Sequence, residues 1–143
     1  MKKKVLIVSA SYYLNITNSL IEDTIVKLDE FKIKHNVIDV PGVFEIPVTI
    51  AKNIKKYDAF IALGCVIKGE TPHFDFISKT TFEGLMSLSI VNKKPIGNGI
   101  ITSLNLEQAI QRSGTGEFVL ENNKDKGKGK EAAKAIISVL FQK

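Results

Sequence analysis

Ala59-Phe60-Ile61-Ala62-Leu63 is a short and wholly apolar run, and the stretch from Gly64 to Asp75 (GCVIKGETPHFD) separates it from a long helical pattern. A continuous apolar run of this length predicts a strand that is buried on both faces, as in a parallel sheet. From about Pro72 to Val91 the apolar residues recur at helical spacing, which predicts a helix. We expect this helix to bury Phe76, Ile77, Leu85 and Leu88.

The same alternation of apolar runs and helical stretches continues along the chain. Further strands are predicted at 5–8, 37–40 and 96–102, and further helices from residue 17 onward and at 46–54, 106–112 and 129–141. Such an alternation predicts an α/β fold in which helices cover both faces of a parallel sheet. There is no internal repeat and no sign of a second domain, so we expect one domain over residues 1–143.

The composition narrows the class of protein. The chain has 143 residues, 44% hydrophobic and 24% charged, which is ordinary for a globular domain. Its one cysteine cannot form an internal disulfide. The apolar run that follows the first lysines ends at Ser9, too early for a signal peptide or a membrane span. We therefore expect a cytoplasmic protein.

Charge and motifs exclude several kinds of site. The net charge is +5, and much of the excess lies between Lys124 and Lys134. This cluster has no interleaved aromatic residues, so a solvated surface is favoured over nucleic-acid binding, and the basic balance suits a phosphorylated small substrate. No metal-ligand cluster, G-x-G-x-x-G or P-loop is present, which disfavours metal, dinucleotide and nucleoside triphosphate sites.

Right-handed crossovers bring the carboxyl ends of all parallel strands to one edge of the sheet, where ligands of open α/β sheets bind. Tyr12 and Tyr13 follow the first strand, and they either stack on a flat heterocycle or pack on the surface. Glu45 follows the second strand in Val40-Pro41-Gly42-Val43-Phe44-Glu45-Ile46-Pro47. Its carboxylate either stabilises a helix start or accepts hydrogen bonds from sugar hydroxyls.

The third strand leads into the most informative segment. Thr71 suits a helix N-cap and Pro72 the first helical position, and the free N–H groups of a helix start can hold a phosphate. His73 lies beside this start, and an imidazole can take and give up protons near neutral pH. The other histidine, His35, lies at the opposite end of the sheet. Cys65 is expected to be a packed, unreactive thiol.

The fourth strand is followed by a short helix, for which Ser103 or Asn105 is the expected cap. Arg112 lies near the end of this helix and is the only arginine in the chain. It either complements the helix dipole or makes a bidentate phosphate contact, which lysine cannot provide.

Taken together, these segments resemble the lumazine synthase family over nearly the whole chain from Lys4. Two segments, Val40–Pro47 and Gly64–Asp75, resemble the two signature segments of the family. A third family segment is matched by Ile101-Thr102, Leu106-Glu107-Gln108-Ala109 and Arg112. The start of the family's last helix is matched by Lys128-Gly129 with Glu131-Ala132-Ala133. The resemblance implies a flavodoxin-like three-layer sandwich around a four-stranded parallel sheet. It also implies a transferase of riboflavin biosynthesis that uses no cofactor and no metal. This enzyme condenses 5-amino-6-(D-ribitylamino)uracil with 3,4-dihydroxy-2-butanone 4-phosphate to 6,7-dimethyl-8-ribityllumazine.

The resemblance also implies roles for individual residues and homopentamers with active sites between neighbouring subunits. Tyr12 would stack on the pyrimidine, Val43, Phe44 and Glu45 would hold the ribityl chain, and Cys65, Val66 and Ile67 would bind the pyrimidine largely through the backbone. Glu70 and Thr71 would meet the phosphate, and His73 would carry protons. From the neighbouring subunit would come Asn98 and Arg112, with Lys128 assisting.

The chain departs from the family pattern at three places. Tyr12 replaces the usual Phe or Trp, and Asn98 stands where the family usually has Phe. The segment 116–126 is longer than in most members, which predicts a pentamer or decamer rather than a 60-subunit shell. Two alternatives stay open at this point: an archaeal-type riboflavin synthase, and a non-enzymatic flavin-binding module of flavodoxin type.

Overall fold

The computed structural model describes residues 2–69, 73–113 and 127–143. Its elements in chain order are β1 (Lys4–Ala10), α1 (Leu14–Glu30), β2 (Lys34–Val40), a 3-10 turn η1 (Val43–Glu45), α2 (Ile46–Lys52), β3 (Ala59–Ile67), α3 (His73–Asn92), β4 (Ile96–Ser103), α4 (Leu106–Arg112) and α6 (Lys128–Leu140). Across the described ranges, no helix is both long enough and apolar enough to span a bilayer.

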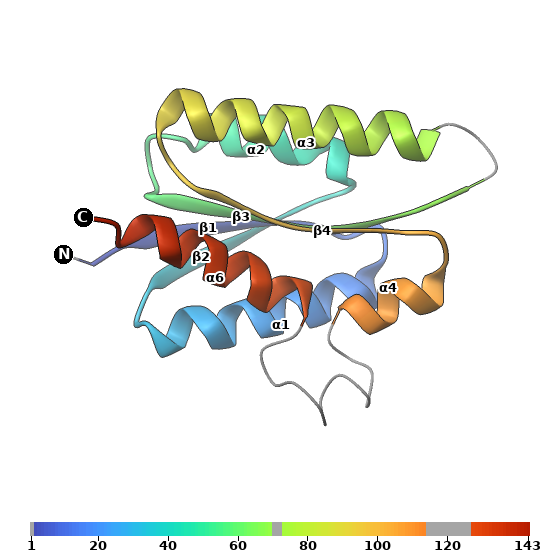
Figure 1. Cartoon of the computed structure of the whole chain (residues 1–143), viewed down its shortest axis with the longest axis horizontal. Coiled ribbons are helices and arrows are strands. Elements are labelled where there is room, and N and C mark those ends of the chain that lie inside the picture. Colours follow the sequence, from blue (N-terminus) through green and yellow to red (C-terminus); the bar gives the residue numbers. More distant parts are fainter. Residues whose placement is uncertain (1, 70–72, 114–126) are drawn as a thin grey trace.

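The four strands form one sheet in the order β2-β1-β3-β4, and every neighbouring pair is parallel. Helices α2 and α3 cover one face of this sheet, and α1, α4 and α6 cover the other (Figure 1). The predicted α/β sandwich around four parallel strands is therefore confirmed. From β1 the chain continues to β2 at one edge of the sheet, and from β3 it continues to β4 at the other edge. The switch point, where a crevice for ligands opens, is thus between β1 and β3.

The core consists of two apolar clusters, one on each face of the sheet. In β1, Val5 and Ile7 point to the cluster under α1 and α6, whereas Leu6 and Val8 point to the cluster under α2 and α3. All four side chains are fully buried, and each contributes on the order of 1.5–3 kcal/mol to folding. Burial on both faces explains why the strand is a continuous apolar run rather than an alternating one.

Several boundaries and side chains differ from the sequence-based expectations. β3 continues to Ile67 instead of ending near Leu63, because its pairing with β4 extends to Ile67 opposite Ser103. Phe76 was expected in the core but is 68% exposed, whereas Leu85, which was also expected there, is buried together with Thr81. Phe141, expected on the apolar stripe of the last helix, follows the end of α6 and is also exposed.

Candidate functional site

A cavity of about 430 Å³ lies at the switch point between β1 and β3. Four segments that are distant in the sequence form it: the β1–α1 turn, η1, the end of β3 and the start of α3. Its lining residues are Tyr12, Tyr13, Gly42, Val43, Phe44, Glu45, Cys65, Val66, Ile67, His73 and Ile77. We call it the first cavity. It brings together seven of the predicted substrate-binding residues and the predicted proton carrier.

The two tyrosines play different structural parts. Tyr13 packs against the core under α1, and burial raises the pKa of its hydroxyl, with smaller contributions from Tyr12 and Cys65. Tyr12 is 78% exposed and meets the Tyr13 ring edge-to-face, with ring centroids 4.9 Å apart. Thr17 anchors the turn that carries both rings, because its hydroxyl donates to the Ala10 carbonyl at 2.7 Å. One tyrosine therefore packs, and the other presents an open ring.

The segment after β2 folds into η1 and sets the orientation of Glu45. The Gly42 N–H donates to Glu45 Oε1 at 3.0 Å, which ties the carboxylate back over the turn. Val43 is buried in the core, whereas Phe44 is 56% exposed at the cavity. The carboxylate therefore has a defined position beside an exposed aromatic ring, and it keeps acceptor capacity for hydroxyl groups.

The end of β3 offers backbone groups to the first cavity. Pairing between β1 and β3 ends at Ser9 opposite Leu63, while pairing between β3 and β4 continues four residues further. The backbone of Cys65–Ile67 therefore lies past the end of the β1 ladder, on the side that faces the tyrosines. Cys65 is buried, as predicted, and its burial raises the pKa of the thiol to about 11, which favours the neutral form.

His73 is the first residue of α3, and its exposed side chain lines the first cavity. Ile77, one turn further on, lines the same cavity because residues i and i+4 share a helix face. Two predicted phosphate-binding residues, Glu70 and Thr71, lie outside the described residues, as does Pro72.

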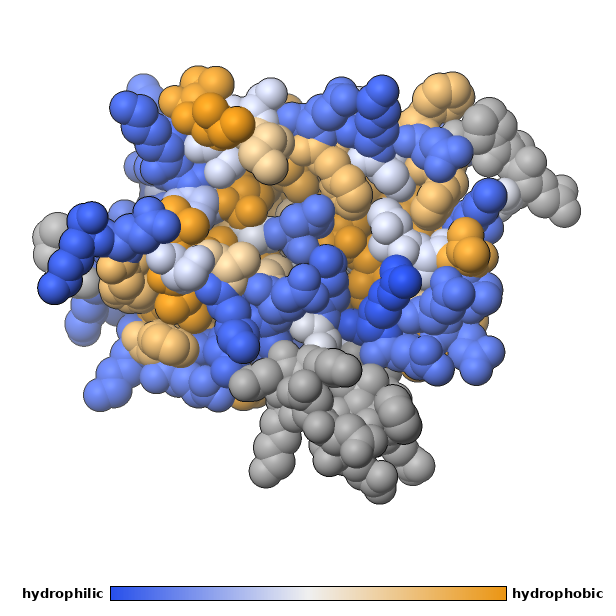
Figure 2. Space-filling view, in the orientation of Figure 1, coloured by the Kyte–Doolittle hydropathy of each residue, from blue (hydrophilic) through white to orange (hydrophobic). Residues whose placement is uncertain are grey.

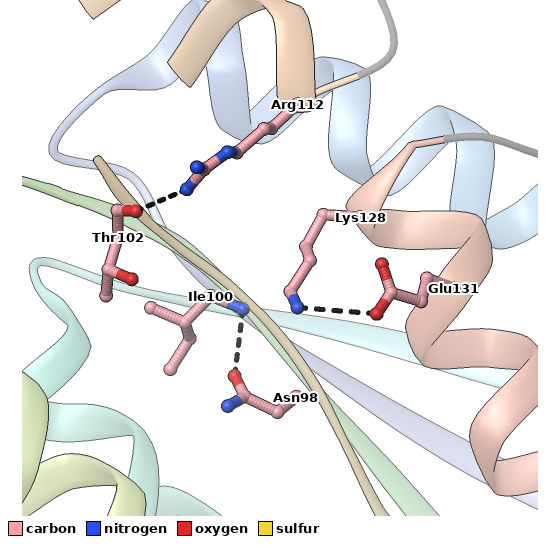
Figure 3. A network of polar contacts seen from close by, with 6 residues as sticks. All are labelled: Asn98, Ile100, Thr102, Arg112, Lys128 and Glu131. Carbon is pink, nitrogen blue, oxygen red and sulfur yellow. Dashed lines mark hydrogen bonds and ion pairs between the residues drawn. The ribbon is translucent and has the colours of Figure 1, made fainter. Parts of the chain in front are cut away.

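A second cavity of about 420 Å³ lies at the outer edge of β4, between α4 and α6. Figure 3 shows its polar network: Arg112 Nη1 donates to the Thr102 carbonyl at 2.6 Å, and Lys128 Nζ lies 3.6 Å from Glu131 Oε1. Asn98 Oδ1 accepts from the Ile100 N–H at 3.0 Å, and the Asn98 side chain lies on the opposite face of β4 from Arg112 and Lys128. Asn105 caps α4, since its side chain accepts from the Gln108 N–H, and this confirms one of the two predicted caps.

The predicted site residues thus fall into two groups. The first cavity holds the predicted pyrimidine, ribityl and proton-transfer residues, whereas Arg112 and Lys128 line the second cavity, and Asn98 lines neither. Sequence reasoning gave no role to Ile77 in the first cavity, nor to Thr102, Gln111 or Glu131 in the second. The available signal was the position of Glu131, about one helical turn after Lys128.

Comparison with known proteins gives one consistent result. The family model described as 6,7-dimethyl-8-ribityllumazine synthase matches residues 2–143. A relative from Rhodopseudomonas palustris named 6,7-dimethyl-8-ribityllumazine synthase 1 is 42% identical, over 96% of this chain and 83% of the relative. Two further relatives are named 6,7-dimethyl-8-ribityllumazine synthase. The one from Bartonella tribocorum is 38% identical, over 100% of this chain and 93% of the relative. The one from Agrobacterium fabrum is 39% identical, over 97% of this chain and 93% of the relative.

Proposed function

This chain belongs to the 6,7-dimethyl-8-ribityllumazine synthase family, and we propose how its two cavities divide the substrates of that reaction. The enzyme is a transferase of riboflavin biosynthesis that condenses 5-amino-6-(D-ribitylamino)uracil with 3,4-dihydroxy-2-butanone 4-phosphate. We assign the whole of residues 1–143 to one catalytic domain. The observation that carries the proposal is the convergence of Tyr12, Phe44, Cys65 and His73 in one cavity at the switch point.

The pyrimidine occupies the first cavity in this proposal. The exposed ring of Tyr12 stacks on the flat heterocycle, and the backbone of Cys65–Ile67 forms hydrogen bonds with its polar edge. The ribityl chain extends past Val43 and Phe44 toward Glu45, whose carboxylate accepts hydrogen bonds from its hydroxyls. Each contact matches the chemistry of the group it meets.

His73 is the proton carrier of the reaction. The 5-amino group attacks the ketone, and loss of water gives an imine. Elimination then breaks the C–O bond to phosphate, the side chain swings round, and the ribitylamino nitrogen closes the ring with loss of a second water. Holding both substrates together supplies on the order of 7–11 kcal/mol of the barrier reduction. Proton transfer by His73, which lines the cavity, adds typically ~10²–10⁴-fold.

We assign the phosphate group to Arg112 and Lys128, in addition to the start of α3. Both cations line the second cavity at the outer edge of β4 rather than the first cavity. A complete site therefore needs the second cavity of one copy to face the first cavity of another. Asn98 lies on the other face of β4 and belongs to the same contributed edge, where its fixed amide replaces an aromatic wall.

A homopentamer supplies this arrangement. α3 leaves Phe76, Met86, Ile90 and Val91 at least 61% exposed, and hydrophobic side chains lie at both ends of the α3 layer at the top of Figure 2. Exposed apolar side chains gathered on one helix support a contact between copies of the chain. We propose a free pentamer or decamer, since the long segment 116–126, which lies outside the described residues, disfavours packing into a shell.

Because the single thiol cannot form an internal disulfide, we also place the enzyme in the cytoplasm.

The activity is tested by mixing the protein with both substrates and following the absorbance of 6,7-dimethyl-8-ribityllumazine. Product that forms only when both substrates are present supports the proposal. Conversion of lumazine alone to riboflavin indicates a riboflavin synthase of archaeal type, and a bound flavin without any turnover indicates a binding module.

The shared site is tested by mixing two impaired variants. H73A removes the proton carrier of the first cavity, and R112A removes the cation of the second. In a randomly mixed ring, about a quarter of the interfaces combine an intact first cavity with an intact second one, so activity recovers to roughly that fraction. If both cavities of one chain formed a site, mixing would restore nothing.

A further inference from the structure

Glu131 lines the second cavity together with the two cations proposed to bind phosphate. Among the described lining residues of this cavity, the charged ones are Arg112, Lys128 and Glu131. Lys128 and Glu131 lie three residues apart in the first turn of α6, and their charged groups are 3.6 Å apart. A carboxylate therefore lines the same cavity to which we assign the phosphate of the substrate.

The two cations are engaged in different ways before any phosphate arrives. One Nη1 donor of Arg112 is bound to the Thr102 carbonyl, which fixes the guanidinium and leaves its other donors available. Lys128 instead faces a negative charge. Its side chain is 29% exposed against 70% for Glu131, so the ammonium is the more enclosed partner and the carboxylate lies toward solvent (Figure 3).

The ordinary explanation for Glu131 is the helix dipole, which favours an acidic residue in the first turn. The positive potential at the start of α6 also favours a bound phosphate, however. The Glu131 carboxylate partly neutralises this potential and so reduces its attraction for phosphate. Glu131 also repels the phosphate directly, although solvent screens this repulsion at an exposed group. Its net effect on phosphate is therefore unfavourable but small.

We propose that Glu131 tunes phosphate affinity: it weakens the hold of Arg112 and Lys128 on the phosphoryl group enough for inorganic phosphate to leave after elimination. This inference rests on the proposed function, which assigns the phosphate to the second cavity. The reaction needs such a device because the leaving group and the substrate carry the same anionic group, and a site that binds both tightly is inhibited by its own product.

Inorganic phosphate is the probe, and isothermal titration calorimetry at low ionic strength is the measurement. We expect E131Q to bind phosphate about 1.4- to fivefold more tightly than the wild type, the scale of one exposed charge, and to be inhibited by phosphate at correspondingly lower concentrations. E131D keeps the charge and should behave like the wild type. D29N changes the net charge equally but sits at the opposite end of the sheet, where it lines a separate pocket with His35, and should leave phosphate binding unchanged.

Salt separates an electrostatic effect from a structural one. The difference between E131Q and the wild type should shrink when the ionic strength is raised from 0.02 to about 0.5 M, because screening removes the repulsion. Equal or weaker phosphate binding by E131Q would overturn the proposed tuning, and so would a difference that D29N reproduces. Phosphate binding that R112K and K128M leave unchanged would instead refute the assignment of phosphate to the second cavity.

Discussion

Gly129 lies directly against the carbonyl of Leu20: a Cβ at Gly129 would come within 2.5 Å of Leu20 O and within 2.7 Å of Thr24 Oγ1. Neither atom can easily yield, because the Thr24 hydroxyl itself donates to that carbonyl at 2.7 Å. The first turn of α6 is thereby seated on α1. This close approach places Lys128, the residue before Gly129, at the second cavity.

The first prediction follows from this contact. G129A should lower the free energy of unfolding by up to about 2 kcal/mol, because an overpacking cost of about 1–3 kcal/mol is only partly offset by the roughly 1 kcal/mol that alanine gains over glycine in a helix. Urea unfolding at one fixed protein concentration measures it. G84A is the matched control, since its Cβ would meet only Pro47 at an ordinary 3.4 Å. Equal stability of G129A and the wild type would show that α6 can shift away from α1 at little cost.

The second prediction concerns His73. H73A should reduce kcat by roughly 10²–10⁴-fold without abolishing turnover, because proximity of the substrates is retained while acid–base help is lost. Steady-state kinetics on both substrates measure the change. The role given to His73 is wrong if the variant turns over at the wild-type rate.

The third prediction concerns stacking by Tyr12, whose ring is 78% exposed. Y12A should raise KM for the pyrimidine roughly two- to twelvefold, the scale of one aromatic pair at ~0.5–1.5 kcal/mol. Y12F keeps the ring and should retain the wild-type KM. If both variants weaken pyrimidine binding equally, the hydroxyl rather than the ring makes the contact.

The fourth prediction concerns Arg112. R112K keeps the positive charge but loses the planar pair of donors, so KM for the phosphorylated substrate should rise about tenfold or more. The KM for the pyrimidine should stay nearly unchanged, because Arg112 lies in the second cavity and the pyrimidine in the first. A rise confined to the pyrimidine would contradict this division of the substrates.

The fifth prediction concerns pH. Burial raises the pKa of the Cys65 thiol to about 11, against an ordinary value near 8.5–9 in the unfolded chain. Between about pH 9 and 11 the unfolded state has released this proton and the folded state has kept it, so the unfolded state binds fewer protons and stability falls as pH rises. Unfolding by urea at pH 8 and pH 10.5 should show a smaller alkaline loss for C65A than for the wild type. Equal losses would show that the thiol ionises as readily when folded.

Local patterns predicted most of the fold. The apolar runs located all four strands, and the signal was clearest for β1 and β3, because strands buried on both faces are nearly continuous apolar runs. The predicted helix at 106–112 agrees with α4, whose cap Asn105 was one of two candidates. Phe76 was misplaced because it lies nine residues, or about two and a half turns, before Leu85 and therefore on the opposite face of α3. The ends of β1, β3 and β4 were set too early, because pairing with a neighbour lengthens a strand beyond its apolar run.

By itself, the sequence determined the chemistry available to this protein: the tyrosine pair, the signature segments, one histidine at the binding edge and one arginine. The tertiary structure alone decided how these groups are distributed. It gathered residues from the β1–α1 turn, η1, β3 and α3 into the first cavity. It placed Arg112 and Lys128 together in the second cavity, separate from the first. The physical reason is the strand order, because placing β4 outside β3 puts its flanking helices at the edge of the sheet, away from the switch point between β1 and β3.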